Sequence, residues 1–256
     1  MKDFLSRWAV KKAYEFDRIV MVTSGKGGVG KSFVATCLAL TMAEMGMSVG
    51  LLDLDLHGPS TPSFLGVKEV RASREGLIPA SREGVEYMSL ALLTKETPLP
   101  FRGEEKWSLV SSVMAMTKWS SRNLVVDMPP GTGDEFLWAL RSFSRGKSKV
   151  LVVTTPSKVS LEVVRRTINM IRDERFPLLG IVENMSYIKC GDKVLRPFGE
   201  VDYSDLGVRL LARIPLDPEV EEVVRSGGLP HKSSPEIERA FKDLVGEVTH
   251  VFGHTR

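Results

Sequence analysis

One glycine-rich run holds the residue types that bind phosphate. It reads GKGGVGKS over residues 25–32 and follows an apolar stretch. Glycines let the backbone wrap a phosphate with its N–H groups, the second lysine reaches the β and γ phosphates, and the serine hydroxyl binds Mg²⁺. The pattern G-x-x-x-x-G-K-[ST] predicts a nucleotide site at Gly25, Lys26, Gly27, Gly28, Val29, Gly30, Lys31, Ser32 and the adjacent Phe33.

The identity of the nucleotide base is predicted from the absence of a guanine-binding motif. GTPases commonly recognise guanine with an Asn-Lys-x-Asp run, and here Asn123, Asn169 and Asn184 are followed by Leu, Met and Met. We therefore expect ATP and ADP as the nucleotides, with Mg²⁺.

Three aspartates lie where apolar runs end. Asp53 and Asp55 are two apart, so on one strand they would share a face, one holding Mg²⁺ through water while the other orients the attacking water. Asp127 follows two valines, as a Walker B carboxylate does. A strand-end aspartate can also cap the next turn. The expected metal ligands are Ser32, Asp53 and Asp127.

The elements that must position these residues alternate along the chain. Buried strands are expected from apolar runs at 18–24, 48–55, 85–91, 123–129, 149–156, 177–184 and 209–215. Helical periodicity is clearest at 31–45, 160–172 and 235–252. This order predicts an α/β fold with a single doubly wound, mostly parallel sheet and helices on both faces, typical of a P-loop NTPase.

The motifs resemble the Mrp/MinD branch of P-loop ATPases. KGGVGKS, with its additional Lys26, is similar to the deviant Walker A of that branch. DLDLHGPS at 53–60, VVDMPPGTGDE at 125–135 and ENMS at 183–186 are similar to Mrp (ApbC) proteins. The likeness covers about residues 18–230, and PPGTGD and ENMS point to Mrp more than to MinD.

The resemblance implies roles for individual residues. Lys26 would contact the nucleotide of the partner subunit in a nucleotide-dependent homodimer, so the catalytic set would be Lys26, Lys31 and Asp55, with Asp55 positioning water. Asn184 would contact adenine, although an asparagine after a strand is as often a turn former. Pro215 would belong to a second base-contacting loop.

One cysteine departs from the family pattern. Mrp proteins that carry iron–sulfur clusters have a C-x-x-C shortly after ENMS, whereas here Cys190 is followed by Gly, Asp and Lys193. A symmetric dimer would offer two thiolates, fewer than a four-iron cluster or a structural zinc site takes. We expect no stable iron–sulfur cluster, and transition-metal binding by Cys190 only if a partner shares it.

The missing ligand favours one of three functions. The favoured interpretation is an ATP-driven switch in metallocentre assembly, resembling the HypB-like nickel-insertion ATPase of hydrogenase maturation, with a HypA-type metallochaperone as client. The alternatives are an Mrp/ApbC-type iron–sulfur cluster carrier and a MinD-like membrane or positioning ATPase.

The chain totals restrict the setting. The net charge is only +3 and no long basic run occurs, so nucleic-acid binding is not expected. Two cysteines and no signal-peptide core predict a cytoplasmic protein. We expect residues 1–17 to form an amphipathic segment before an ATPase domain at 18–256. That segment could contact a membrane, which is the less expected outcome, or pack on its own domain.

Overall fold

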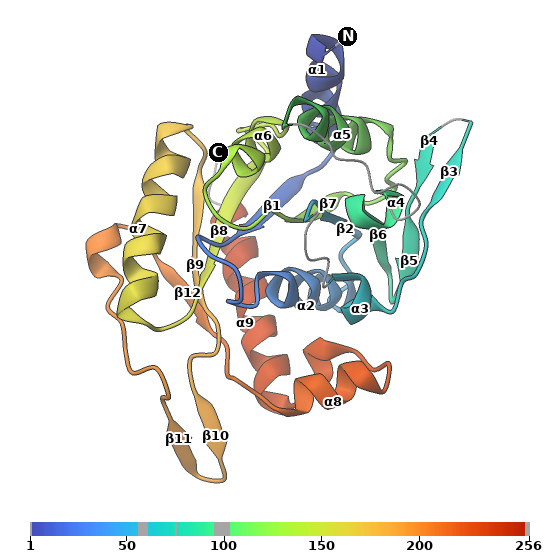
Figure 1. The fold of residues 1–256 in the computed structure, drawn as a ribbon. Helices are drawn as coiled ribbons and strands as arrows, with labels where there is room; N and C mark the ends of the chain where they lie inside the picture. The colour runs from blue at the N-terminus through green and yellow to red at the C-terminus, as the bar shows by residue number, and fades with distance from the viewer. Residues whose placement is uncertain (1, 56–60, 75, 95–102, 254–256) are drawn as a thin grey trace.

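A computed structural model of the chain describes residues 2–55, 61–74, 76–94 and 103–253. Within these residues the centre is an eight-stranded sheet, in which β5 alone runs antiparallel to its neighbour (Figure 1). The strands lie in the order β12 (Leu210–Arg213), β9 (Leu178–Glu183), β8 (Ser148–Thr154), β1 (Arg18–Thr23), β7 (Asn123–Asp127), β2 (Val49–Asp53), β6 (Val85–Ser89) and β5 (Ala80–Arg82).

The central strands β1, β2, β7 and β8 are buried on both faces because most of their residues are apolar. In β1, Ile19 and Met21 belong to one core cluster, and Val20 and Val22 belong to the other. Successive side chains of a strand point to opposite faces, so the two clusters are the two sides of the sheet. Continuous apolar runs of this kind are typical of parallel strands covered by helices.

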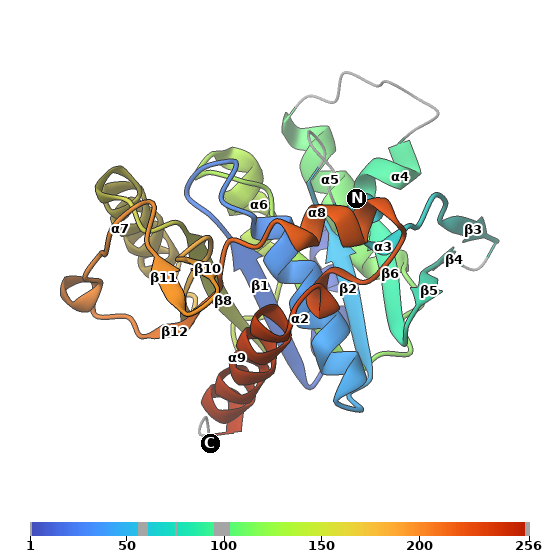
Figure 2. The ribbon, with the colours of Figure 1, turned by 90° about the horizontal axis from the view of Figure 1, so that it is seen from below.

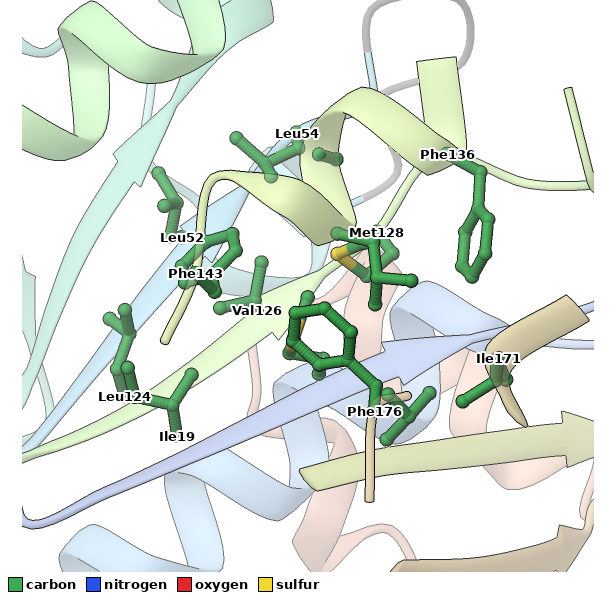
Figure 3. Packing of buried hydrophobic residues seen from close by; sticks show 14 of the residues in the cluster. Ile19, Leu52, Leu54, Leu124, Val126, Met128, Phe136, Phe143, Ile171 and Phe176 are labelled. Carbon is green, nitrogen blue, oxygen red and sulfur yellow. The ribbon is translucent and has the colours of Figure 1, made fainter. Parts of the chain in front are cut away.

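Helices cover each face. The helices α1 (Lys2–Ala13), α5 (Gly103–Met116), α6 (Asp134–Arg141) and α7 (Lys158–Asp173) pack on one side, and α2 (Lys31–Glu44) and α9 (Pro235–Gly253) pack on the other (Figure 2). Figure 3 shows the first side, where Phe136, Phe143 and Phe176 pack over Val126 and Met128. Shorter helical segments are α3 (Thr61–Leu65), α4 (Leu90–Thr94), α8 (Glu219–Arg225), η1 (Ser204–Leu206) and η2 (Pro230–Lys232).

The predicted fold class is confirmed. All seven expected strands and all three expected helices are present within a few residues of the predicted bounds. Two small hairpins were not predicted, β3 (Arg71–Ser73) with β4 (Gly76–Ile78) and β10 (Ile188–Cys190) with β11 (Lys193–Leu195). Their three-residue strands are mostly exposed, so they lack the apolar pattern that identifies a buried strand.

The amino-terminal segment packs on the body of the protein. Helix α1 lies against α5, and its Ala9 and Ala13 are fully buried in the core, whereas Trp8 is about half exposed. Small side chains let the two helices approach closely. Among the described residues, no helix combines the length and the apolar character needed to cross a membrane. The division at residue 17 stays a prediction.

Candidate nucleotide site

The glycine-rich loop joins the end of β1 to the first turn of α2. Gly28 and Gly30 have φ values of 78° and 80°, a region that residues with a Cβ rarely adopt. A Cβ on Gly30 would also lie only 2.2 Å from Nδ2 of Asn184. The loop therefore needs glycine at these positions, and its backbone N–H groups lie at a helix amino terminus, where anions bind.

Gly25 needs glycine for a different reason. A Cβ there would lie 2.4 Å from Cγ1 of Val163 and 2.6 Å from Oγ1 of Thr167, both on α7. The first glycine of the motif thus serves close packing of the loop against a helix, whereas the sequence pattern predicts only backbone freedom.

A cleft of about 550 Å³ opens over this loop. It is lined by residues of the loop, the start of α2 and four other segments: Ser24, Gly27, Gly28, Gly30, Lys31, Ser32, Phe33, Asp55, Phe64, Pro130 and Met185. A second cleft of about 280 Å³ shares Gly30, Phe33, Phe64 and Met185 with it, and extends to Asn184 and Pro215. Because they share a wall, the clefts form one groove, which runs from the glycine-rich loop, its phosphate end, to Asn184 and Pro215.

The phosphate end contains a buried ion pair. The ammonium group of Lys31 contacts Oδ1 of Asp127 and lies 3.9 Å from Oδ2 of Asp55. The other oxygen of Asp127 accepts a hydrogen bond from the Thr61 hydroxyl at 3.0 Å. The structure therefore brings together the predicted lysine and two of the three predicted aspartates.

Asp53 lies beside this pair and is held by hydrogen bonds. Its Oδ1 accepts one from the backbone N–H of Asp55 (3.0 Å), and its Oδ2 accepts hydrogen bonds from Tyr87 and Ser89 (3.2 Å each). Burial, followed by the negative charge of Asp127, raises the pKa of Asp53 to about 7.

One geometric expectation is wrong. Asp55 lies beyond the end of β2, which finishes at Asp53, so the two side chains are not placed by strand alternation. A turn held by the Asp55 N–H brings the second carboxylate toward Lys31 instead. Of the motif at 53–60, the part from 56 onward lies outside the described residues.

The segment after Asp127 is tied to the glycine-rich loop. The N–H of Gly131 donates to the carbonyl of Ser24 at 2.9 Å, and Gly131 has a φ of 84°. This hydrogen bond holds the 129–133 segment against the residue that precedes the glycine-rich loop.

The residues at the phosphate end fit Mg²⁺. Asp53, Asp55 and Asp127 are buried around the ammonium group of Lys31, so the local charge is negative, and Mg²⁺ prefers the hydroxyl and carboxylate oxygens that Ser32 and these aspartates offer. No group of three or more His, Cys, Asp or Glu side chains suited to a metal ion occurs in the described part of the chain. The phosphate end of the groove therefore suits a Mg²⁺ ion whose ligands are mostly water and phosphate oxygens.

The end of the groove away from the phosphate end is organised by Asn184. Its buried side chain follows β9 and donates from Nδ2 to the carbonyl of Val29 at 2.9 Å. The next residue, Met185, has a φ of 56° and lines both clefts. The amide therefore ties the groove wall to the glycine-rich loop, and Pro215 lines the same cleft as Asn184.

Comparison with known proteins identifies the family. A family model described as ParA, NUBPL iron-transfer P-loop NTPase, matches residues 15–249. The chain belongs to this family. It is therefore a P-loop ATPase, and the predicted resemblance to the Mrp/MinD branch is confirmed at the family level.

Relatives of this P-loop ATPase carry consistent names. It is 39% identical to an iron–sulfur cluster carrier protein of Saccharolobus solfataricus, over 90% of this chain and 82% of the relative. It is 34% identical to the cytosolic Fe-S cluster assembly factor Nubp2 homolog of Anopheles gambiae, over 91% of this chain and 96% of the relative. These names favour the cluster-carrier alternative over nickel insertion, for which the comparisons give no support.

Solved structures agree with the fold. The ADP complex of the nucleotide-binding protein from Archaeoglobus fulgidus aligns with a TM-score of 0.77 and 30% identity, covering 92% of this chain and 96% of that chain. The septum site-determining protein MinD from Pyrococcus horikoshii, with Mg-ADP, aligns with a TM-score of 0.69 and 22% identity, covering 92% and 97%. The second match supports the fold alone.

Cys190 is the last residue of β10, shortly after the ENMS motif. The thiol is exposed, and the hairpin register places Lys193 directly opposite it across a turn in which Gly191 has a φ of 59°. The structure thus brings Cys190 together with a lysine, and no metal-binding group forms around it among the described residues.

Several residues in and beside the groove were not predicted. Phe64 and Met185 line both clefts, and Tyr87 and Ser89 bind Asp53. Met185 lies inside the ENMS motif and could have been found from it. The contacts of Tyr87 and Ser89 depend on the pairing of β2 with β6, for which a single sequence contains no signal.

Proposed function

We propose that this protein is a Mg²⁺-dependent ATPase that acts as a nucleotide-controlled homodimer in the assembly of iron–sulfur clusters. The observation that carries the proposal is the phosphate end of the groove, where Lys31 lies among three buried aspartates. The family and the names of the relatives supply the client chemistry. The name of the Anopheles relative supports a cytosolic setting.

The residues of the site have different roles in ATP hydrolysis. The loop N–H groups and Lys31 bind the phosphates, while Ser32, Asp53 and Asp127 hold Mg²⁺ directly or through water. When bound, the metal offsets the charge of the phosphates and of the transferred phosphoryl group. Asp55, whose carboxylate faces the cleft, orients the attacking water.

Lys26 acts in the partner's site. Its side chain is half-buried and does not line the cleft of its own chain, although Gly27 and Lys31 of the same loop do. Its carbonyl accepts a hydrogen bond from Ser24, which fixes the loop at that point. A cation that enters only on dimer closure links hydrolysis to assembly of the dimer.

The cluster is cargo that the dimer holds incompletely. Two exposed Cys190 thiolates, one from each subunit, leave a four-iron cluster short of ligands. The client supplies the remaining ligands, so the cluster is passed on and is not stored. A client of the iron–sulfur pathway therefore replaces the HypA-type partner expected from the sequence.

A transfer assay tests the proposal. The protein is incubated anaerobically with ferrous iron, sulfide and the apo-form of a four-iron enzyme, with ATP or a non-hydrolysable analogue, and recovery of the enzyme is followed. We expect hydrolysable ATP and Cys190 to be required, so Lys31→Ala and Cys190→Ser should both reduce the rate of recovery.

The matched control is Cys37→Ser, which removes the buried cysteine of the core. ATP-dependent delivery of nickel, together with cluster recovery that is indifferent to Lys31 and Cys190, would overturn the proposal.

A further inference from the structure

Two hydroxyl groups on β6 hold one oxygen of Asp53. The phenol of Tyr87 and the hydroxyl of Ser89 each donate to Oδ2 of Asp53 at 3.2 Å, and all three residues are fully buried. A buried hydroxyl that gives its hydrogen to a carboxylate makes a stronger bond than one between neutral groups. Neither residue belongs to the glycine-rich loop or to the motifs of the nucleotide site.

The register of the sheet creates this contact. In the pairing of β2 with β6, Asp53 lies beside Ser89, and Leu51 lies beside Tyr87. Side chains two apart on a strand share a face, so both hydroxyls reach the side of the sheet to which Asp53 points. Substitution of either one would leave the backbone pairing intact.

The same register places a second carboxylate on the other side. Asp53 also pairs with Asp127 across β2 and β7. The two carboxylates are neighbours, and it is Asp127 that Lys31 contacts. Like charges at adjacent positions repel each other. The hydroxyls of β6 therefore draw the Asp53 carboxylate away from Asp127 and keep its second oxygen directed along the Asp55 turn.

We propose that Tyr87 and Ser89 are positioning residues that hold Asp53 in the orientation that binds Mg²⁺ with the nucleotide. This inference rests on the proposed role of Asp53 in the ATPase. Both residues act through Asp53, since neither lines the cleft over the glycine-rich loop. Their loss changes the affinity for the metal and leaves the affinity for the metal-free nucleotide unaltered.

Mn²⁺ binding measures this effect directly. Mn²⁺ replaces Mg²⁺ and is titrated by electron paramagnetic resonance into ADP-bound protein, while ADP affinity is measured in EDTA. Tyr87→Phe removes one hydroxyl and keeps the ring. Loss of a hydrogen bond to a charged group should weaken Mn²⁺ binding about tenfold. The ADP affinity in EDTA should be unchanged. Ser89→Ala should act in the same direction, and Ser89→Thr should restore binding.

Tyr203→Phe is the matched control because it removes a buried phenol hydroxyl from the opposite side of the sheet to Tyr87. It should leave Mn²⁺ affinity unchanged. Folded Tyr87→Phe and Ser89→Ala variants that bind Mn²⁺ like the wild type would overturn this inference alone. A wild-type protein that binds ADP but no Mn²⁺ would overturn the proposed metal site as well.

Discussion

Cys190 and Lys193 are paired residues of one hairpin, directly opposite each other on β10 and β11. The family signature C-x-x-C would place its second thiol at the position of Lys193. Directly opposed residues of an antiparallel pair lie on the same face with Cβ atoms about 5 Å apart, so two cysteines there could bind one metal centre. The hairpin therefore pairs the two positions of the C-x-x-C signature but has a thiol at only one of them.

Lys193→Cys should therefore create a stable cluster site. We expect the variant dimer, with four thiolates, to retain iron and sulfide after anaerobic reconstitution and desalting, whereas the wild type loses them. Visible absorption and iron content measure the difference. Lys193→Ser is the control, since it removes the positive charge without adding a ligand. Equal iron retention by Lys193→Ser and Lys193→Cys would contradict the interpretation.

Three glycines of the loop should differ in their tolerance of alanine. Gly27 has open space where the methyl group of alanine would lie, Gly28 has open space but a positive φ, and Gly30 has both a positive φ and Asn184 at 2.2 Å. A left-handed residue with a Cβ costs about 1 kcal/mol or more. Destabilisation without nucleotide should increase from Gly27→Ala to Gly28→Ala to Gly30→Ala.

Urea unfolding measures the order. The Gly30→Ala variant should additionally lose the bond from Asn184 to Val29, so its excess cost should disappear in an Asn184→Ala background. Equal costs for Gly28→Ala and Gly30→Ala would show that the contact with Asn184 is unimportant.

Asp53 should make the stability of the protein depend on pH. Its pKa is about 7 in the folded chain, against about 4 in an unfolded one. The folded state therefore binds more protons between these values, and the free energy of unfolding falls as the pH rises through this window. Asp53→Asn removes this dependence. Without Mg²⁺, the melting temperature of the variant relative to that of the wild type should therefore be higher at pH 8 than at pH 5 by about 3 °C or more.

Calorimetry at several pH values checks this result. Glu86→Gln is a comparison of opposite sign, because hydrogen bonds from Ser120 and Ser121 outweigh partial burial and lower the pKa of Glu86. Its stabilising contribution is lost only as the pH falls through that lowered value. A constant difference between Asp53→Asn and wild type across the range would show that Asp53 does not titrate there.

The sequence predicts best what depends on local pattern. The strand with Val125 and Val126 at its centre is recognised as an apolar run, because a parallel strand buries both of its faces. The glycines of the loop are recognised because they form a sequence motif. The position of Asp55 was predicted less well, because the end of β2 at Asp53 depends on a turn. The bond of Tyr87 to Asp53 follows from strand pairing, which pattern alone does not specify.

Lys26→Ala should separate nucleotide binding from turnover. If Lys26 completes the partner's site, the variant binds ATP with normal affinity but hydrolyses it slowly, because binding uses Lys31 and the loop of its own chain.

Mixing inactive variants distinguishes the two possible placements of Lys26, in the partner's site or in its own. A heterodimer of Lys26→Ala with Asp55→Asn contains one complete site if Lys26 acts across the interface, and none if it acts within its own chain. We expect ATPase activity to reappear on mixing, measured as phosphate release, whereas mixing Lys26→Ala with itself restores nothing. Failure of the mixture to regain activity, with heterodimer formation verified, would assign Lys26 to its own site.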